Sequence, residues 1–364
     1  MKIGIVTQPL SRNYGGILQN YALQQTLIAL GHTPYTFDLG AFGWGDVVET
    51  NIKSIVKRLI GRPANFVTTP KQYALSELPL RRFVESHISL IKPRSKRPTA
   101  AKIAEYGLEA LVVGSDQVWR PRYNYAIEDM YLGFACSLNI RRIAYAASFG
   151  TEEWEYSEAQ AAKCRELITM FDAISVREDS GVELCRKHFG VEAQQVLDPT
   201  LLLTVEEYNT LTTSIPQRKE PILFAYLLDR SAEKLAFVEQ MAKQRGLSVV
   251  VVGADGELQE SDSIEQWLSY FRDARYVVTD SFHGSAFSVI YNREFTVMGN
   301  PKRGNSRMMS LLRQLGIEER YCEELDAVEA LEAPAWDEVN SRLKQLRESA
   351  LQYLEESLEK EFRV

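Results

Sequence analysis

Short apolar runs alternate along this chain with longer segments that repeat hydrophobic residues at helical spacing. The first run, residues 2–7, predicts a buried strand, and residues 17–30 predict a helix that Gly31 ends. The loop between them carries adjacent glycines but lacks the Gly-x-Gly-x-x-Gly dinucleotide fingerprint. Strand, loop and helix in this order form the first half of a βαβ unit.

The same alternation continues through the rest of the chain. Further strands are predicted at 36–39, 109–113, 142–147, 173–176, 195–197, 222–228, 248–252, 276–279 and 295–298. Further helices are predicted at 157–170, 181–188, 232–245, 264–273 and 308–315, with a charged amphipathic helix at 336–362. Strands that alternate with helices in this way predict an α/β protein with parallel sheets.

A polar stretch at 201–220 divides the pattern into two series of strands and helices. We therefore predict two Rossmann-like lobes that face a cleft, an N-terminal lobe at 1–205 and a C-terminal lobe at 220–335. The amphipathic segment 336–364 is expected to pack back across the lobes. A chain of 364 residues is long enough for two domains.

Polar side chains follow six of the predicted strands at their carboxyl ends. They are Asn13, Asp116, Ser148, Arg177, Asp198 and His283. Parallel strands end on one side of a sheet, so together these residues indicate a shared cleft, although each alone is typical of a turn or cap. Arg177 differs, because an arginine directly after an apolar strand needs an acidic partner or an anionic ligand. Glu178 and Asp179 are the neighbouring acids.

The stretch 276–289 is the centre of this pattern. An apolar strand leads into a turn at 280–283, and Gly284-Ser285 opens an apolar helix. A helix N-terminus at the end of a parallel strand favours an anion, and His283 in that turn could donate to the anion or move a proton. The alternative interpretation is a capping turn whose histidine is satisfied by backbone.

Composition favours a soluble globular protein, with 45% hydrophobic and 25% charged residues. No signal-peptide pattern and no apolar run of membrane-spanning length is apparent. The four cysteines form no Cys-x-x-Cys pair, and there are only four histidines, so we expect no metal and no other cofactor. These features predict a protein of a reducing cytoplasm. The net charge of −7 argues against nucleic acid as a partner.

The charge is uneven along the chain. Residues 51–102 hold twelve basic residues and only two acidic ones, Glu77 and Glu85, a local net charge of +10. The basic residues are Lys53, Lys57, Arg58, Arg62, Lys71, Arg81, Arg82, Lys92, Arg94, Lys96, Arg97 and Lys102. This segment is either a solvated insert or a patch that approaches an anionic membrane surface or a lipid-diphosphate substrate. Phe66 and other apolar residues among the charges could enter such an interface.

Five motifs occur in order along the chain: NYGGILQNYAL at 13–23, GSDQVW at 114–119, SVRE at 175–178, LDPTL at 197–201 and TDSFHGSAFS at 279–288. Together they resemble the polysaccharide pyruvyl transferase family, from the first strand to the helix after Arg307. The Ser-Phe-His-Gly form resembles a branch found in surface-polysaccharide gene clusters. The resemblance implies a GT-B-like pair of lobes. It also implies transfer of pyruvate from phosphoenolpyruvate to two hydroxyls of a sugar, as a cyclic ketal.

The resemblance also implies a donor site on the C-terminal lobe. In this family an arginine after a central strand and an Arg-Leu-His triplet hold the donor, and these correspond to Arg177 and to Ser281, Phe282 and His283. One cation of the triplet is therefore missing at Ser281. The further donor-binding candidates are Gly284, Ser285, Lys302, Arg303 and Arg307, of which the three basic residues could replace the missing cation.

Roles follow from the chemistry that the resemblance implies. Arg177 and a protonated His283 are expected to stabilise the leaving phosphate, and Asp116 and Asp280 are candidate bases for the sugar hydroxyls. The acceptor is expected on the N-terminal lobe, at Asn13, Tyr14, Gly15, Gly16, Gln19, Ser115, Asp116 and Ser148. The basic segment favours a lipid-linked glycan as acceptor and a peripheral position at the inner face of the membrane.

Two other functions remain open at this point. The same two-lobed fold serves glycosyltransferases of the GT-B type that use nucleotide sugars, because fold does not decide function. A non-catalytic glycan-binding relative would keep the cleft and lose the reaction, and the departure at Ser281 is in its favour. Binding of phosphoenolpyruvate, of a nucleoside diphosphate, or of sugar without turnover would distinguish the three.

Overall fold

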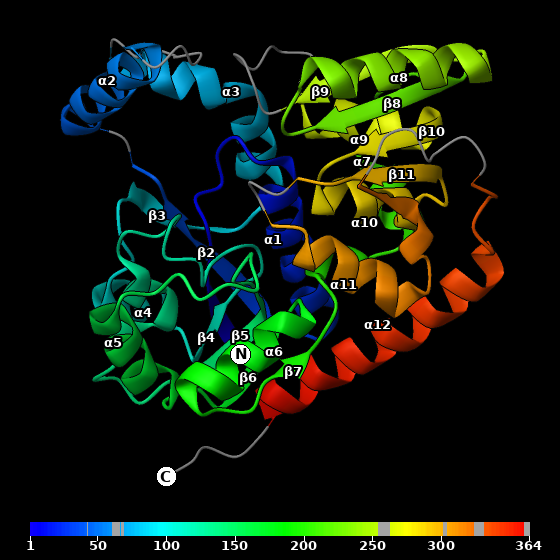
Figure 1. The fold of residues 1–364 in the computed structure, drawn as a ribbon. Coiled ribbons are helices and arrows are strands. Elements are labelled where there is room, and N and C mark those ends of the chain that lie inside the picture. The colour runs from blue at the N-terminus through cyan, green and yellow to red at the C-terminus, as the bar shows by residue number, and fades with distance from the viewer. Residues whose placement is uncertain are drawn as a thin grey trace.

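The computed structural model describes residues 1–41, 43–59, 66, 69–253, 263–300, 304–323 and 331–359. The chain forms two parallel sheets, one in each lobe (Figure 1). This confirms the expected α/β fold with two Rossmann-like lobes. No described helix has both the length and the apolar character that crossing a membrane requires.

The first lobe is built on a seven-stranded sheet with the order β3-β2-β1-β4-β5-β6-β7. Every neighbouring pair in this sheet is parallel. The strands are β1 (Lys2–Val6), β2 (Thr33–Leu39), β3 (Leu90–Ser95), β4 (Ala110–Val113), β5 (Arg141–Ala147), β6 (Ala173–Val176) and β7 (Gln194–Gln195). The central strands are buried on both faces, which is why their sequences are continuous apolar runs.

The second lobe is built on a five-stranded parallel sheet with the order β12-β11-β10-β8-β9. Its strands are β8 (Ile222–Leu227), β9 (Ser248–Gly253), β10 (Ala274–Thr279), β11 (Glu294–Met298) and β12 (Tyr321–Cys322). The apolar run at 276–279 is the fully buried part of β10, at the centre of this sheet. The loop that follows β10 therefore leaves the sheet from its middle.

Helices cover the sheets (Figure 1). Those of the first lobe are α1 (Tyr14–Ala29), α2 (Trp44–Leu59), α3 (Pro70–His87), α4 (Ala100–Tyr106), α5 (Glu158–Ile168) and α6 (Asp179–Leu184), which continues as a π-helix at Cys185–Phe189. Those that follow are α7 (Val205–Leu211), α8 (Ala232–Arg245), α9 (Ile264–Asp273), α10 (Phe282–Ile290), α11 (Ser306–Leu315) and α12 (Trp336–Glu359). Short 3-10 helices lie at Ile127–Tyr131, Gly133–Ala135, Pro199–Leu201 and Glu318–Arg320. The helices α1, α5, α6, α8, α9, α10, α11 and α12 overlap those that the apolar periodicity predicts, whereas α2, α3, α4 and α7 were not predicted.

Several elements differ from the sequence-based expectation, and β3 and α10 show the physical reasons. β3 was not predicted, because Lys92, Pro93 and Arg94 interrupt its apolar pattern; it is an edge strand, where a proline costs no ladder hydrogen bond. α10 begins at Phe282, two residues earlier than expected, so Phe282 and His283 lie in its first turn. His283 is thus fixed by a helix and does not belong to a flexible turn.

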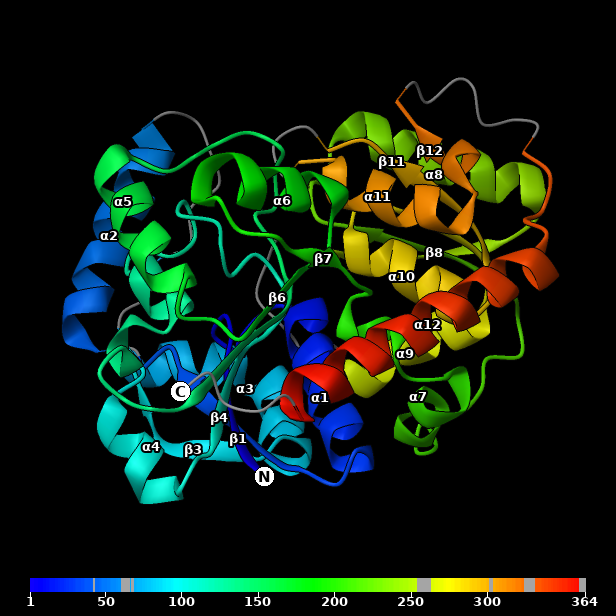
Figure 2. The same ribbon diagram turned by 90° about the horizontal axis from the view of Figure 1, so that it is seen from below.

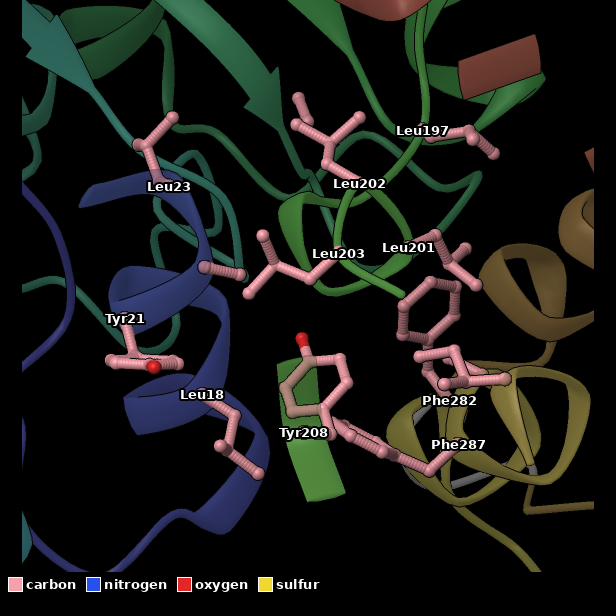
Figure 3. Close-up of a cluster of buried hydrophobic side chains, with 14 of the residues drawn as sticks. Leu18, Tyr21, Leu23, Leu197, Leu201, Leu202, Leu203, Tyr208, Phe282 and Phe287 are labelled. Atoms are coloured by element: carbon pink, nitrogen blue, oxygen red, sulfur yellow. The ribbon is translucent and has the colours of Figure 1, made fainter. Parts of the chain in front are cut away.

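An apolar core continues from one lobe into the other. Figure 3 shows its central part, where the segment that carries Leu201 and Leu203 lies between α1 and α10. Tyr208 of α7 packs edge to face on Phe287, with ring centroids 4.9 Å apart. Because these side chains are fully buried, the two lobes share one core at this junction.

α12 connects the lobes a second time. It runs from the second lobe back to the first (Figures 1 and 2). Along its length Arg342 donates to Leu315 O of α11, Arg347 donates to Leu201 O, and Tyr353 donates to Ala144 O of β5. These bonds to carbonyls of both lobes, with the buried leucines of α12, hold the lobes in one arrangement.

Candidate active site

Each sheet has a point where its strand order reverses. In the first lobe this point lies between β1 and β4, and in the second between β8 and β10. Ligands of open α/β sheets bind outside the carboxyl ends of the strands at such points. The loop after β1 carries Asn13, the loop after β4 carries Asp116, and His283 lies in the first turn of α10, the helix that follows β10. The sequence-predicted residues therefore lie where the topology favours a ligand site.

Arg177 is the central side chain between the lobes. It follows β6 directly, its side chain is 1% exposed, and its Nη1 donates to Asp198 Oδ2 at 2.6 Å. The guanidinium lies over the Phe282 ring of α10, 4.3 Å from the centroid. Burial alone would lower the pKa of Arg177, but Asp198, Asp116 and Glu178 outweigh it and raise that pKa. Arg177 therefore contacts both lobes as a fixed cation.

Asp198 organises the polar groups around Arg177. Its Oδ2 also accepts from Ser115 Oγ at 2.7 Å, and its Oδ1 accepts from the Thr200 backbone N–H and hydroxyl. Burial alone would raise the pKa of Asp198, but the charge of Arg177, with His283 and the Thr200 bonds, lowers it to about 2. Asp198 is thus a permanent carboxylate that anchors Arg177.

Asn13 and Asp116 join the two loops at the first-lobe switch point. Asn13 Nδ2 donates to Asp116 Oδ2 at 2.9 Å and makes no capping bond to α1. Asp116 has a φ of 69°, a left-handed conformation that aspartate tolerates better than most residues. A Cβ at Gly16 would lie 2.8 Å from Asn13 Nδ2, so only glycine leaves room for the Asn13–Asp116 hydrogen bond.

His283 is the second-lobe residue of the site. Its Nε2 lies 3.9 Å from Asp198 Oδ2, and a Cβ at Gly15 would lie 1.9 Å from its Nδ1. Burial, assisted by Arg177 and Arg307, lowers the pKa of His283 in spite of the nearby Asp198 and Asp116. The imidazole is therefore neutral at neutral pH. This corrects the expectation of a protonated histidine, because desolvation and two guanidinium groups oppose its charge.

Arg307, in the first turn of α11, adds a second buried cation. Burial, and then the charge of Arg177, lower its pKa to about 10, so the guanidinium stays charged at pH 7. Asp116 and Glu178 act in the opposite direction, which places Arg307 within reach of the same group of charges. The two other candidates for the missing cation, Lys302 and Arg303, lie outside the described residues.

Glu178 lies beneath the site. Its Oε1 accepts from the Phe149 and Gly150 backbone N–H groups and from Ser148 Oγ, at 2.8 to 3.2 Å. The Ser148 hydroxyl, a predicted acceptor contact, is thus committed to Glu178, and the Ser115 hydroxyl is committed to Asp198. Both serines support the carboxylates of the site and do not face a ligand directly.

Several buried polar atoms of this group lack hydrogen bonds. Within the described part of the chain, Arg177 Nε and Nη2, Glu178 Oε2 and His283 Nε2 have none. The acids nearest to the two Arg177 nitrogens are Glu178 and Asp116, at 3.9 and 3.8 Å, beyond hydrogen-bond distance. A carboxylate or phosphate oxygen would satisfy the guanidinium donors. We call Asn13, Asp116, Arg177, Asp198, His283 and Arg307 the interlobe cluster.

Asp280 does not have the arrangement expected of a catalytic base. Its Oδ1 accepts from the Leu228 N–H at 2.6 Å, and its Oδ2 accepts from the Asp229 N–H, Lys234 Nζ and Asn300 Nδ2 at 2.7 to 3.1 Å. The carboxylate is 0% exposed in its ion pair with Lys234. Asp280 therefore holds together the loops of its own lobe and has no oxygen available to a sugar hydroxyl.

The remaining predicted residues have packing roles. Tyr14 stacks on Trp267 of α9 with centroids 5.3 Å apart, and Gln19 donates to Thr7 Oγ1 and Gly16 O inside the first lobe. In the second lobe Ser281 N-caps α10 by its backbone, Ser285 Oγ donates to Ser281 O, and Gly284 leaves room for the Thr279 hydroxyl. These residues position the two helix N-termini that meet at the cluster.

Asp198 and Phe282 belong to the site, although the sequence did not assign them a role there. Asp198 was one of the polar residues at strand ends, and the Asp-Pro step after a strand was the signal that could have found it. Phe282 stood in the family triplet, but nothing in the sequence indicates that its ring contacts Arg177.

A cavity of about 880 Å³ opens beside the cluster, between the lobes. First-lobe residues on its wall include Arg120, Glu155 and Asp179, and second-lobe residues include Ser306 and Arg313. Asp179 and Ser306 are the chain neighbours of Glu178 and Arg307, whereas the residues of the interlobe cluster do not themselves line this cavity. Among the described residues no group of three or more histidine, cysteine or acidic side chains could hold a metal ion.

The fold and the cluster define a two-lobed, GT-B-like α/β protein with a buried arginine–histidine site between the lobes. The family model of polysaccharide pyruvyl transferases matches residues 13–302, and the chain belongs to this family. The match confirms the family that the five motifs indicated. It supports a transferase that acts in the pyruvylation of polysaccharides.

Solved structures resemble this chain only in fold. The UDP-GlcNAc 2-epimerase of Neisseria meningitidis has a TM-score of 0.46 at 10% identity, over 100% of this chain and 95% of that one. The glycosyltransferase SsfS6 of Streptomyces sp. SF2575 has a TM-score of 0.46 at 13% identity, over 98% and 99% of the two chains. At these values the likeness says nothing of the substrate. A search of curated proteins found no match.

Proposed function

We propose that this protein transfers pyruvate from phosphoenolpyruvate onto two hydroxyls of a sugar in a surface polysaccharide or its lipid-linked precursor. The products are a cyclic ketal and phosphate. The observation that carries the proposal is the buried Arg177 at the lobe junction, whose Nε and Nη2 form no hydrogen bond within the described residues. Membership of the pyruvyl transferase family supplies the reaction class.

The donor suits the charge of the interlobe cluster. Phosphoenolpyruvate carries a carboxylate and a phosphate, and such anions are bound by guanidinium groups and helix N-termini. Arg177 and Arg307 are two buried guanidinium groups, and the first turn of α10 presents its N-terminus beside them. Arg307 thereby supplies the cation that Ser281 does not provide, which supports a donor site in spite of the altered triplet.

The reaction balances with the groups present. A proton adds to the methylene carbon, one sugar hydroxyl attacks the adjacent carbon, and the bond from that carbon to the phosphate oxygen breaks. The second hydroxyl then closes the ring. Of the two hydroxyl protons released, one balances the proton gained by the methylene carbon and the other leaves with phosphate. Arg177 and Arg307 stabilise the departing phosphate.

His283 and Asp116 are the groups proposed to move these protons. His283 is neutral at neutral pH because burial lowers its pKa, so it can accept a hydroxyl proton at Nε2. Asp116 is oriented by Asn13 at 2.9 Å and lies at the first-lobe switch point, where the acceptor sugar is proposed to bind. The N-terminus of α1, with its adjacent Gly15 and Gly16, is proposed to bring backbone close to that sugar.

A nucleotide-sugar glycosyltransferase is the alternative that the fold alone permits. In a doubly wound lobe a nucleotide diphosphate would bind at the switch point between β8 and β10. There the Asp280 carboxylate already occupies the Leu228 and Asp229 N–H groups and the Lys234 ammonium. A second anion at that place would meet repulsion and no available donor from these groups, which favours the pyruvyl transferase over this alternative. The two buried cations Arg177 and Arg307 also weigh against a purely glycan-binding relative.

Thermal unfolding with ligands tests the proposal. A ligand present at about 100 times its Kd stabilises by about 2.7 kcal/mol, which is a clear shift in Tm. We expect phosphoenolpyruvate to raise the Tm of the wild type and not that of Arg177→Ala. Uridine and guanosine diphosphates are expected to give no shift. A shift with a nucleoside diphosphate alone would contradict the proposal and favour the glycosyltransferase.

A further inference from the structure

α2 has its apolar side turned to solvent. Six of its seven large apolar residues are exposed by half or more of their area, whereas Val47 alone is buried. The six are Trp44 (66%), Val48 (59%), Ile52 (56%), Ile55 (50%), Val56 (54%) and Leu59 (81%). Soluble helices normally bury such a face against the core, so this one is suited to an apolar surface outside the chain.

These six residues form one stripe, which we call the α2 stripe. At 3.6 residues per turn their positions fall within about 120° of the helix circumference. Of the residues of α2, only Gly45 shares that arc, so no polar side chain interrupts the stripe. The opposite side attaches α2 to the lobe through the buried Val47 and Ser54. The stripe therefore faces away from the body, and Figures 1 and 2 both show α2 at the outer edge of the first lobe.

Basic residues lie on both sides of the stripe. Arg58 projects from the helix beside one edge, and Lys53, which is 70% exposed, lies beyond the other edge in an ion pair with Glu49. Lysine and arginine beside an apolar face can keep their charges at a lipid headgroup layer while the face enters the acyl boundary. Trp44, at the start of the stripe, is a residue type enriched at that boundary.

The basic segment at residues 51–102 presents less positive charge to its surroundings than its sequence suggests. Arg81 pairs with Asp38, Lys96 with Asp46 and Arg97 with Asp129, and these three acids lie outside residues 51–102. Arg94 pairs with Glu77. The three outside acids offset three of the ten net positive charges, so part of the basic character remains beside the apolar stripe.

We propose that α2 is an interfacial helix that docks the protein on an anionic lipid bilayer by inserting the α2 stripe. A bilayer fits better than a protein partner, because protein interfaces place about one hydrogen bond in every 100–200 Å² and this arc has no polar side chain to form one. The basic residues at its borders complement anionic headgroups. Docking is peripheral, since the helix lies along the surface and does not cross it.

The orientation of α2 connects this surface with the proposed function, on which the connection rests. A pocket of about 340 Å³ lies on another side of the same helix, lined by Thr50 and Lys53 of α2, by Tyr73 and Arg94, and by Ser11 from the loop that leads to Asn13. A docked α2 would hold this pocket at the membrane surface. A glycan on a lipid carrier would then reach the interlobe cluster without leaving the bilayer.

Vesicle flotation tests the docking. We would use vesicles of equal parts phosphatidylethanolamine and phosphatidylglycerol with the wild type, the double variant Ile52→Asp/Ile55→Asp, and Ile28→Asp. Ile28 is 49% exposed on α1 and serves as the matched control. The wild type and Ile28→Asp are expected to float equally, and the double variant to bind at least about tenfold more weakly. Equal flotation of all three proteins, or none by the wild type, would overturn the proposal.

Trp44 gives a readout at the stripe itself. Its fluorescence is expected to shift to the blue on addition of the same vesicles. The shift should be absent in Trp44→Phe, because Trp119 and Trp267 are buried and Trp154 and Trp336 are packed against the core. If the stripe is covered by a second copy of the chain, the wild type will be a dimer in light scattering, the double variant a monomer, and vesicles will have no effect. That outcome would also overturn the proposal.

The outcome for docking is separable from that for the reaction. The phosphoenolpyruvate-dependent Tm shift should be the same in the wild type and in Ile52→Asp/Ile55→Asp, since α2 lies apart from the interlobe cluster. Conversely, Arg177→Ala should float like the wild type. A protein that floats but does not respond to phosphoenolpyruvate would refute the proposed function alone, and the reverse result would refute the docking alone.

Discussion

Each lobe has a buried charged side chain directly after a strand, and the two charges are surrounded in opposite ways. In the second lobe Asp280 follows β10 and accepts from four donors at 2.6 to 3.1 Å, two of them backbone N–H groups. At the lobe junction Arg177 makes one close bond to Asp198 and leaves two nitrogens without a hydrogen bond in the described chain. One site is saturated by its own lobe and the other is not.

This difference teaches that topology locates a crevice but does not decide its use. A buried carboxylate with donors on both oxygens stabilises the lobe, because removing one partner would leave a charge uncompensated. A buried guanidinium with unused donors costs stability, and such groups are typical of sites that bind a ligand. The contacts therefore indicate a structural role for Asp280 and support ligand binding at Arg177.

The largest effect is expected from Arg177→Ala. The variant removes the two unused donors and leaves Asp198 buried without its cation, so we expect affinity for phosphoenolpyruvate to fall by about 100-fold or more. We also expect the free energy of unfolding to fall by about 3–5 kcal/mol. Calorimetric titration and urea unfolding measure the two. Arg177→Lys is the control, because it keeps a charge near Asp198 and loses the fork of donors. Unchanged affinity for phosphoenolpyruvate in Arg177→Ala would contradict the assignment of ligand binding to Arg177.

Asp280→Asn should separate stability from binding. The variant leaves Lys234, whose side chain is 14% exposed, without its carboxylate, and we expect it to cost about 3 kcal/mol of folding stability. Binding of phosphoenolpyruvate by the folded fraction should not change. Adding Lys234→Met should restore part of the stability, since the unpaired charge is then removed. Lost ligand affinity with unchanged stability would assign Asp280 to the active site after all.

Gly15→Ala tests the contact between Gly15 of the first lobe and His283 of the second. A methyl group there would lie 1.9 Å from His283 Nδ1, so the imidazole or the whole of α10 must move. We expect a loss of about 1–3 kcal/mol in stability and weaker phosphoenolpyruvate binding. The control is Gly45→Ala in α2, where nothing lies within 4 Å of the new atom. Equal Tm values for the two variants would show that Gly15 and His283 are not in contact in solution.

The smallest effect concerns His283 and pH. Its pKa is lowered in the folded protein, so the unfolded chain takes up a proton as the pH falls below about 6.5 while the folded protein does not. Stability from this group is present above that pH and is lost below it. When the pH is lowered from neutral to about 5, the free energy of unfolding measured in urea should fall on the order of 1 kcal/mol less for His283→Gln than for the wild type. Parallel pH profiles would contradict a buried neutral imidazole.

The architecture could be predicted from the sequence because it rests on local pattern. Apolar runs such as Ala110–Val113 and Ala173–Val176 are buried on both faces and have one interpretation, a strand of a parallel sheet. β3 was missed because its edge position, which tolerates Pro93, is a property of the sheet and not of the segment.

The site could be predicted only as a set of strand ends. Asn13, Asp116, Arg177 and His283 were found because parallel strands bring their carboxyl ends together. The fate of each side chain depended on partners that the sequence does not specify. Asp280 follows its strand just as Arg177 does, yet Leu228, Asp229 and Lys234 engage it. For the same reason the charge of residues 51–102 did not reveal its partners Asp38, Asp46 and Asp129.

Calorimetric titration of three proteins with phosphoenolpyruvate tests the central claim most directly. The wild type, Arg177→Ala and Asp280→Asn would be titrated under identical conditions in which each is folded, as shown by circular dichroism. The account predicts that the wild type and Asp280→Asn bind with equal affinity and that Arg177→Ala does not bind. Binding that survives in Arg177→Ala and disappears in Asp280→Asn would contradict it, and would place the donor in the switch point of the second lobe.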